Sequence, residues 1–326
     1  MAQEERTITW QLSDPAMGTL ERAGLAALYM TLRAAEEQSA DLRPLRWAAS
    51  DLTSDAVTLH WSGKDEDAFL KLFAWAWQVR DGVFYLPGVH REPEQRDFAY
   101  RRAPTHNGLL GTFLQHNRVQ PRSKGKEATT LIEQLEEDKQ IQVRFLAVDP
   151  NQHGIKPLED ARSCFQKGLL STKSVSLSGW VFPGIAPRYG AEKAWQGPAN
   201  RALLLMLAPI ACCYQRLKGK GNNWVFVVPD VLDLSEFNEI RPFLFLSPDA
   251  VDVASLGDAG LRFAAAYAGR SLSKEISTGC WVVAMGKVDY YSSQSVRKAV
   301  LVPITPSQER VGIAISLAPW AGISAD

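Results

Sequence analysis

The chain has 326 residues, of which 46% are hydrophobic and 10% aromatic, so it can bury the core of one large domain or two medium ones. Lys plus Arg and Asp plus Glu balance to no net charge, and no apolar run reaches the ~20 residues of a membrane span. The acidic segment 1–6 lacks the apolar core of a signal peptide, so we expect a cytoplasmic protein without a membrane partner.

The first predicted elements are a strand over residues 8–12 and a helix that follows it. Apolar residues at 8, 10 and 12 alternate with polar ones, as in a half-buried strand. Asp14 and Pro15 suit the cap and first turn of a helix that continues to about residue 32. Its apolar positions recur every three or four residues, and small residues around Gly24 would let another backbone lie close.

Further strands and helices follow without a regular βαβ rhythm. We predict strands over residues 45–52, 57–61, 83–86, 141–148, 175–182, 224–228, 243–246, 280–288, 299–304 and 312–317. We predict helices over residues 65–79, 105–116, 127–138, about 201–217 and 248–268. This order favours an α+β fold of mixed sheets with packed helices. A weak boundary in the loop at 149–160 would separate an N-terminal α/β portion with a basic loop, residues 1–150, from a second α/β portion, residues 151–326; a single domain is the alternative.

Segments distributed over nearly the whole chain resemble one protein family. They are residues 8–32, Asp81–Gly88, Lys167–Leu170, Trp180–Gly184, Leu207–Tyr214 and Val227–Phe237. In this order they resemble the large subunit of type I CRISPR surveillance (Cascade) complexes, in the Myxan-type, DevT-like branch. The shared motifs are packing and turn patterns and carry no catalytic signature.

This resemblance implies a non-catalytic large subunit of a CRISPR RNA-guided DNA-targeting complex, which recognises the motif that flanks the target and helps to open and hold the duplex. The implied partners are the guide RNA, the target DNA and the backbone, guide-end-capping and small subunits of Cascade. Recruitment of a nuclease or of transposition proteins stays open. Such large subunits usually continue into a C-terminal helical bundle, whereas this chain stops at Asp326, so we expect a separate small subunit to supply the bundle.

Positive charge is concentrated in the middle third of the sequence. Residues 101–220 hold 18 Lys and Arg against 9 Asp and Glu, and residues 101–126 contain no carboxylate. Because surfaces usually intersperse both signs, a polyanion is the simplest ligand for such a segment. The candidate nucleic-acid-binding residues are Arg101, Arg102, Asn107, Arg118, Arg122, Lys124 and Lys126 in one stretch, and Lys173, Ser174, Lys218, Lys220, Asn222 and Asn223 in another.

Each of these assignments has a structural alternative. The segment 122–126 is either a loop that orders on phosphates or a solvated connector. Lys173 and Ser174 fit a turn before a strand equally well, and the segment 218–223 fits the cap of a helix as well as contacts to phosphates or base edges. The competing function is a protein-interaction scaffold whose basic surface binds an acidic protein partner.

The sequence contains no recognisable catalytic or cofactor motif. Phosphate-loop, zinc-protease, nucleophile-elbow and dinucleotide-binding patterns are missing, and the five histidines do not pair at metal-ligand spacing. The four cysteines, Cys164, Cys212, Cys213 and Cys280, show no C-x-x-C spacing and are typical of small core residues in a reduced compartment. We therefore expect no enzyme activity, no metal and no cofactor.

Overall fold

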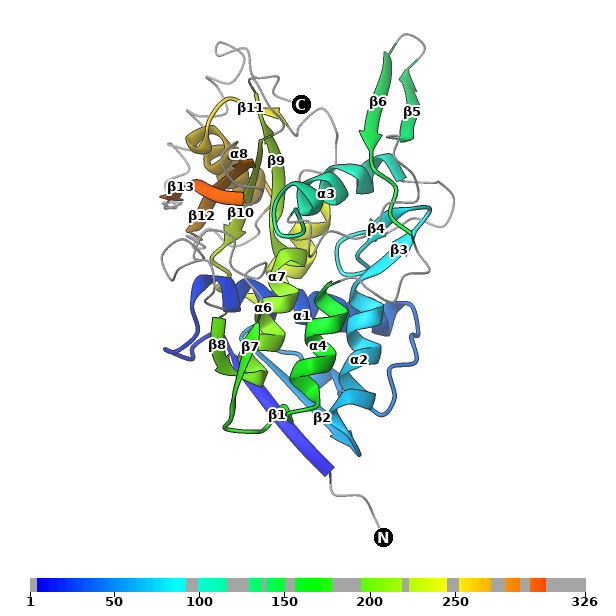
Figure 1. Cartoon of the computed structure of the whole chain (residues 1–326), viewed down its shortest axis with the longest axis vertical. Helices are drawn as coiled ribbons and strands as arrows, with labels where there is room; N and C mark the ends of the chain where they lie inside the picture. Colours follow the sequence, from blue (N-terminus) through cyan, green and yellow to red (C-terminus); the bar gives the residue numbers. More distant parts are fainter. Residues whose placement is uncertain are drawn as a thin grey trace.

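The computed structural model describes residues 5–91, 99–115, 129–136, 139–149, 156–177, 195–218, 223–244, 252–270, 279–287 and 294–302. Within these ranges, helices combine with one five-stranded sheet and four two-stranded sheets (Figure 1). The predicted α+β class is therefore confirmed. One hydrophobic cluster contains residues from both sides of position 150, and the division of the chain there stays a prediction.

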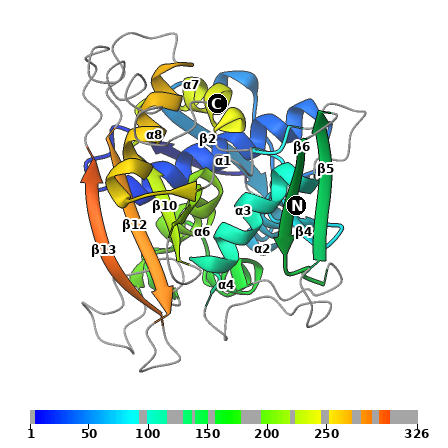
Figure 2. The same cartoon turned by 90° about the horizontal axis from the view of Figure 1, so that it is seen from above.

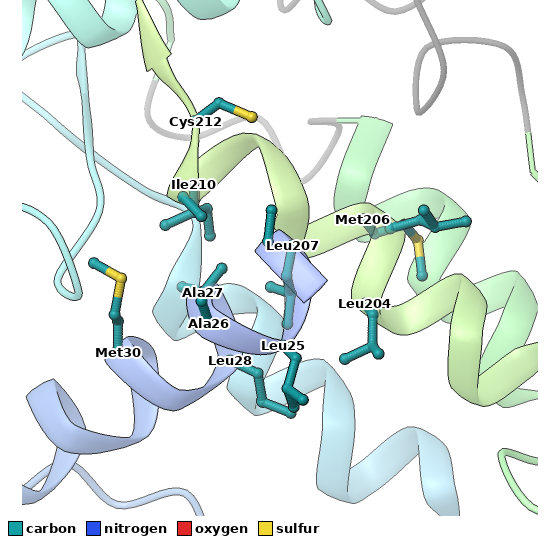
Figure 3. Close-up of a cluster of buried hydrophobic side chains, with 14 of the residues drawn as sticks. Leu25, Ala26, Ala27, Leu28, Met30, Leu204, Met206, Leu207, Ile210 and Cys212 are labelled. Carbon is teal, nitrogen blue, oxygen red and sulfur yellow. The ribbon is translucent and has the colours of Figure 1, made fainter. Parts of the chain in front are cut away.

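Two buried helices cross in the middle of the molecule. They are α1 (Thr19–Glu37) and α6 (Ala199–Ala211), and nearly every residue of α6 is buried. Figure 3 shows Leu25 and Ala27 of α1 gathered against Leu204 and Leu207 of α6. A helix that is apolar on all sides needs neighbours all round, which is why α6 lies inside the core.

The first turn of α1 lies later than predicted. Asp14 does not cap the helix, because its Oδ1 accepts a hydrogen bond from the Ala16 amide at 2.9 Å in the turn before it. The helix begins instead after Gly18, whose amide donates to Oε2 of Glu21 at 3.0 Å. This carboxylate three residues inside the helix stabilises its first turn.

The end of the molecule that holds the N-terminus is built from short strands and two helices (Figure 1). The two-stranded sheets are β1 (Glu5–Gln11) with β2 (Ala56–Ser62), and β7 (Ser174–Leu177) with β8 (Trp195–Pro198), both antiparallel. The helices are α2 (Asp65–Ala76) and α4 (Lys156–Phe165). Their contact is aromatic, since the ring of Phe165 lies 5.4 Å from that of Phe69 and 5.6 Å from that of Phe73.

The five-stranded sheet has the order β11-β9-β10-β12-β13 and contains the more C-terminal strands. These are β9 (Cys213–Leu217), β10 (Trp224–Pro229), β11 (Asp252–Val253), β12 (Cys280–Lys287) and β13 (Gln294–Val302). The helix α8 (Leu256–Ala268) contacts all five strands, and α7 (Leu234–Ile240) contacts α1. All pairings are antiparallel except that of β11 with β9.

The remaining elements surround α3 (Ala99–Gly111), which packs on β9 and β10. They are the hairpin of β3 (Gln78–Arg80) with β4 (Val83–Tyr85), and the hairpin of β5 (Thr129–Glu136) with β6 (Lys139–Phe145). Figure 2 shows β5 and β6 on the opposite side of the molecule from β12 and β13. Two short 3-10 helices, η1 (Ala49–Asp51) and η3 (Arg241–Phe243), complete the described elements.

Several predicted elements are wrong. The segment 127–138 contains the strand β5, because pairing with β6 outweighs its helical composition. The helix predicted to end near 217 ends at Ala211, and the chain continues as β9 paired with β10. Residues 45–52 form only isolated bridges to β2 together with η1.

Other predicted boundaries shift or cannot be compared. The helix expected from residue 105 begins at Ala99, and the helix expected from 248 begins at Leu256. The strand predicted over 243–246 overlaps the 3-10 helix η3 at its first residue. Residues 312–317 and the outer parts of several other predicted strands lie outside the described ranges.

Candidate nucleic-acid interface

The residues predicted at the start of the basic stretch lie on α3. Arg101 belongs to the helix, of which the structure describes the backbone at that position. The side chain of Arg102 is only 3% exposed, lies over the ring of Tyr85 at 5.8 Å and approaches Asp81 at 3.7 Å. A direct contact of this guanidinium with nucleic acid would require it to leave the interior. The sequence predicted positive charge in this segment, but the orientation of α3 directs the Arg102 side chain into the interior.

Asn107 joins two elements instead of projecting into solvent. Its side-chain amide donates to the carbonyl of Arg144 on β6 at 2.8 Å, which fixes α3 against this strand. The neighbouring His106 is buried and accepts from the Phe84 amide at Nδ1, 3.2 Å away, while Nε2 lies 2.9 Å from the carbonyl of Leu146. Burial lowers the pKa of His106 from 6.5 to about 4, so the ring is neutral and donates through Nε2.

Lys173 and Ser174 lie at the start of β7, and both are exposed. The Ser174 hydroxyl donates to the carbonyl of Gly197 on the partner strand at 3.4 Å, and the Lys173 amide donates to Oγ of Ser171 at 3.2 Å. The turn before a strand therefore exists, and the Lys173 side chain extends from it toward solvent. A turn before the strand and a nucleic-acid contact through Lys173 are therefore compatible interpretations of this segment.

Lys218 lies directly after β9, and Asn223 lies directly before β10. The Lys218 amide donates to the carbonyl of Val253 at 2.8 Å, and the Leu217 amide donates to the carbonyl of Asn223 at 2.9 Å. The segment thus follows a strand, so its interpretation as a helix cap is wrong. Lys218 is exposed, and the neighbouring Arg216 is occupied by a bidentate ion pair with Asp252, at 2.6 and 2.8 Å.

The described candidates do not form one patch. The start of β7 lies toward the end of the long axis that holds the N-terminus, whereas the end of β9, paired with β11, lies toward the other end (Figure 1). The remaining candidates lie outside the described residues: Arg118, Arg122, Lys124, Lys126, Lys220 and Asn222. The structure therefore presents Lys173 and Lys218 as separate exposed cations.

Sequence reasoning missed three cations around a pocket at the β1–β2 end: Arg6, Lys64 and Lys167. They come from three separate segments, each with carboxylates nearby in sequence, so no local excess of charge marks them. It also missed Arg241, which is 1% exposed and donates to the carbonyls of Ala211 and Cys212 at 2.9 and 2.6 Å. Only the arrangement of α6 and η3 brings Arg241 to these two carbonyls.

The four cysteines are free and buried, as their spacing predicted. Burial raises the pKa of Cys164 and of Cys280 to about 12, and raises the pKa of Cys212 and Cys213 as well. A thiol with a raised pKa is a poor nucleophile at neutral pH, so core packing is the better account of these residues. Over the ranges that the structure covers, no cluster of three His, Cys, Asp or Glu side chains could hold a metal ion.

No helix in the described part of the chain combines the length and the apolar character that crossing a membrane requires.

The chain is an α+β protein with a continuous core and separate exposed cations. It belongs to the family of the DevT N-terminal domain, whose model matches residues 9–206. The resemblance expressed by the packing and turn motifs is therefore confirmed.

The chain is also similar to the CRISPR-associated protein Cas8a1/Csx13 from Myxococcus xanthus strain DK1622. The two are 26% identical over 309 residues, which cover 89% of this chain and 51% of the relative. The chain therefore spans about half the length of this relative. The similarity extends beyond the residues that the family model matches.

Proposed function

We propose that the chain acts as the large subunit of a CRISPR RNA-guided DNA-targeting complex. The observation that carries this proposal is the similarity to Cas8a1/Csx13 over 89% of the chain, together with membership of the DevT N-terminal domain family. In such a complex, base pairing with the guide reads the target sequence, and the protein needs contacts to phosphates and a few base edges. The exposed cations and the absence of carboxylates from residues 101–126 suit that division.

The proposed contacts are refined by the geometry of the candidate residues. Lys173 and Lys218 are exposed and stay in the set, with the basic residues of the segment 118–126. Arg102 and Asn107 hold α3 in place through Tyr85 and the carbonyl of Arg144, so we assign them a positioning role. Changes at these two positions should act on folding before they act on binding.

The proposed partners are the guide RNA, the target DNA and the backbone, guide-end-capping and small subunits. In this assembly the chain recognises the motif that flanks the target and helps to hold the opened duplex. It contributes binding and no chemistry of its own. DNA cleavage by the purified chain, abolished by a chelator, would contradict this assignment.

The test uses the assembled complex with Arg122, Lys124 and Lys126 replaced by alanine. Affinity is measured at several salt concentrations on duplexes that differ only in the flanking motif. Loss of phosphate contacts should weaken binding equally on all duplexes and reduce the salt slope by roughly one unit for each contact. Arg102→Ala is the comparison for a folding effect.

One outcome would contradict the proposed contacts, and another would contradict the proposed function. Unchanged affinity and slope would identify the segment 122–126 as a solvated connector. A chain that never joins a guide-bearing complex, and instead binds an acidic protein with weak salt dependence, would favour the scaffold alternative.

A further inference from the structure

A pocket of about 520 Å³ opens between the start of α2 and the end of α4. Its rim carries three cations: Arg6 on β1, Lys64 directly before α2, and Lys167 two residues after the end of α4. Two carboxylates, Asp65 and Glu66, also line it, so the balance of charge depends on how these are occupied.

Asp65 is fully engaged inside the protein. It is 5% exposed and accepts from Nη1 of Arg6 at 2.6 Å, from Nε1 of Trp61 at 2.8 Å and from the Leu169 amide at 2.5 Å. Three donors satisfy the carboxylate. The carboxylate in turn holds Arg6 at the rim, where 44% of the arginine side chain is exposed. The ion pair with Arg6 compensates the negative charge of this carboxylate.

Glu66 is directed toward a fourth cation. Its Oε1 lies 3.5 Å from Nε of Arg162 on α4, which compensates its charge. Lys64 and Lys167 are exposed, and neither forms an ion pair with a carboxylate in the described part of the chain. These two ammonium groups are therefore the charges that the pocket offers to an incoming anion.

Two glycines with positive φ line the pocket. Gly63 and Gly168 have φ values of 84° and 88°, which a residue with a side chain adopts only with strain. A Cβ at Gly168 would meet nothing closer than Ser171 at 3.7 Å, so glycine at this position serves the turn and also leaves space in the pocket. The exposed Gln166 adds an amide donor and acceptor to the lining.

We propose that this pocket binds a backbone phosphate of single-stranded nucleic acid. The pocket is concave and of the size of a small-molecule site, which suits one nucleotide unit and excludes the cylinder of a duplex. The exposed Lys173 follows six residues after Lys167 in the same connection to β7 and adds a further cation to this segment. This inference deepens the proposed function, because it names the form of nucleic acid that the β1–β2 end would hold.

The experiment reverses the two uncompensated charges in the full chain, with Lys64→Glu and Lys167→Glu combined. Binding of labelled single-stranded RNA, single-stranded DNA and duplex DNA is followed by fluorescence anisotropy over a series of salt concentrations. We expect affinity for the single strands to fall about tenfold and the salt slope to fall by about 0.7, the contribution of one phosphate contact to a single strand. Comparison of the single-stranded RNA with the single-stranded DNA shows which of the two nucleic acids the pocket prefers.

The matched control reverses two exposed cations elsewhere, with Lys71→Glu and Arg270→Glu combined. This control has the same net charge and should bind single strands nearly as the original chain does. Equal losses in both variants, or an equal loss on duplex DNA, would mean that overall charge acts and would overturn the pocket. Retained unfolding free energy in both variants shows that folding is not the cause.

A second measurement locates the ligand directly. An oligonucleotide with photoreactive 4-thiouridine should crosslink to peptides that contain residues 63–64 or 166–168, and inorganic phosphate should compete only at high concentration. Crosslinks confined to other segments would overturn the inference. Failure of the chain to join a guide-bearing complex, with pocket crosslinks intact, would instead count against the proposed function alone.

Discussion

Gly24 of α1 lies directly against the backbone of Leu204 of α6. A Cβ at Gly24 would overlap the carbonyl oxygen and carbon of Leu204 and stand 3.0 Å from its Cα. The obstacle is backbone inside a buried helix, so no side chain can rotate away. This contact explains why small residues gather around Gly24, and it sets how closely the two central helices approach.

Gly24→Ala should therefore destabilise the protein strongly. Separation of α1 from α6 would be the only way to admit the methyl group, and overpacking of this kind costs about 3 kcal/mol. The free energy of unfolding from urea titration measures the effect. Gly257→Ala is the matched control, because its Cβ would meet only Oγ of Ser255 at 3.7 Å, and better helix propensity should leave stability equal or higher. Similar losses in both variants would refute the close-contact account.

Asp65→Asn should loosen the link between α2 and the turn at Leu169. The amide cannot accept from Arg6, the Trp61 indole and the Leu169 backbone together, and a buried donor left without an acceptor costs about 1–3 kcal/mol. Asp67→Asn, on the same helical turn but exposed, should change the unfolding free energy by less than about 0.5 kcal/mol. Hydrogen exchange of the Leu169 amide gives a local readout, and unchanged protection in Asp65→Asn would contradict the prediction.

Arg241→Met should destabilise the end of α6 by about 2–3 kcal/mol, because two buried carbonyls lose charged donors. The arginine also places positive charge at the negative end of the helix dipole. Arg270 offers a matched comparison, since its Nη1 donates to the Ala266 carbonyl at 3.2 Å in an exposed position near the end of α8. Arg270→Met should cost no more than about 0.5 kcal/mol in a urea titration. An equal cost at both sites would show that burial does not matter here.

His106 should make stability fall in acid. Its folded pKa of about 4 lies below the unfolded value of 6.5, so its contribution is complete above pH 6.5. As the pH falls toward 4, the unfolded ring gains a proton that the buried ring refuses, and at most about 3 kcal/mol is lost. The buried His90, whose pKa is also lowered by burial, acts in the same direction.

Urea titrations between pH 4 and 7.5 measure this slope. His106→Gln should reduce the dependence of the unfolding free energy on pH. Leu109→Ala, which creates a cavity beside the same helix, should instead lower the unfolding free energy by a similar amount at every pH. A slope in His106→Gln as steep as in the original chain would exclude His106 as its source.

Periodicity within single segments predicted some elements of this fold correctly and failed for others. The alternation of Ile8 and Trp10 and the small residues near Gly24 predicted a strand and a closely packed helix, because both depend on nearest neighbours along the chain. The same local reasoning failed for residues 127–138 and 212–217. Each segment has a helix-compatible composition, and it is extended because it pairs with the strand that follows it in the sequence.

By itself, the sequence determined the α+β class, the membership of the DevT N-terminal domain family and the burial of the four cysteines. Only the tertiary structure decided that Arg102 points inward and that Arg6, Lys64 and Lys167 share a pocket. The physical reason is that hydrophobic periodicity records which residues leave water, whereas the direction of a charged side chain depends on elements that meet only when the chain folds.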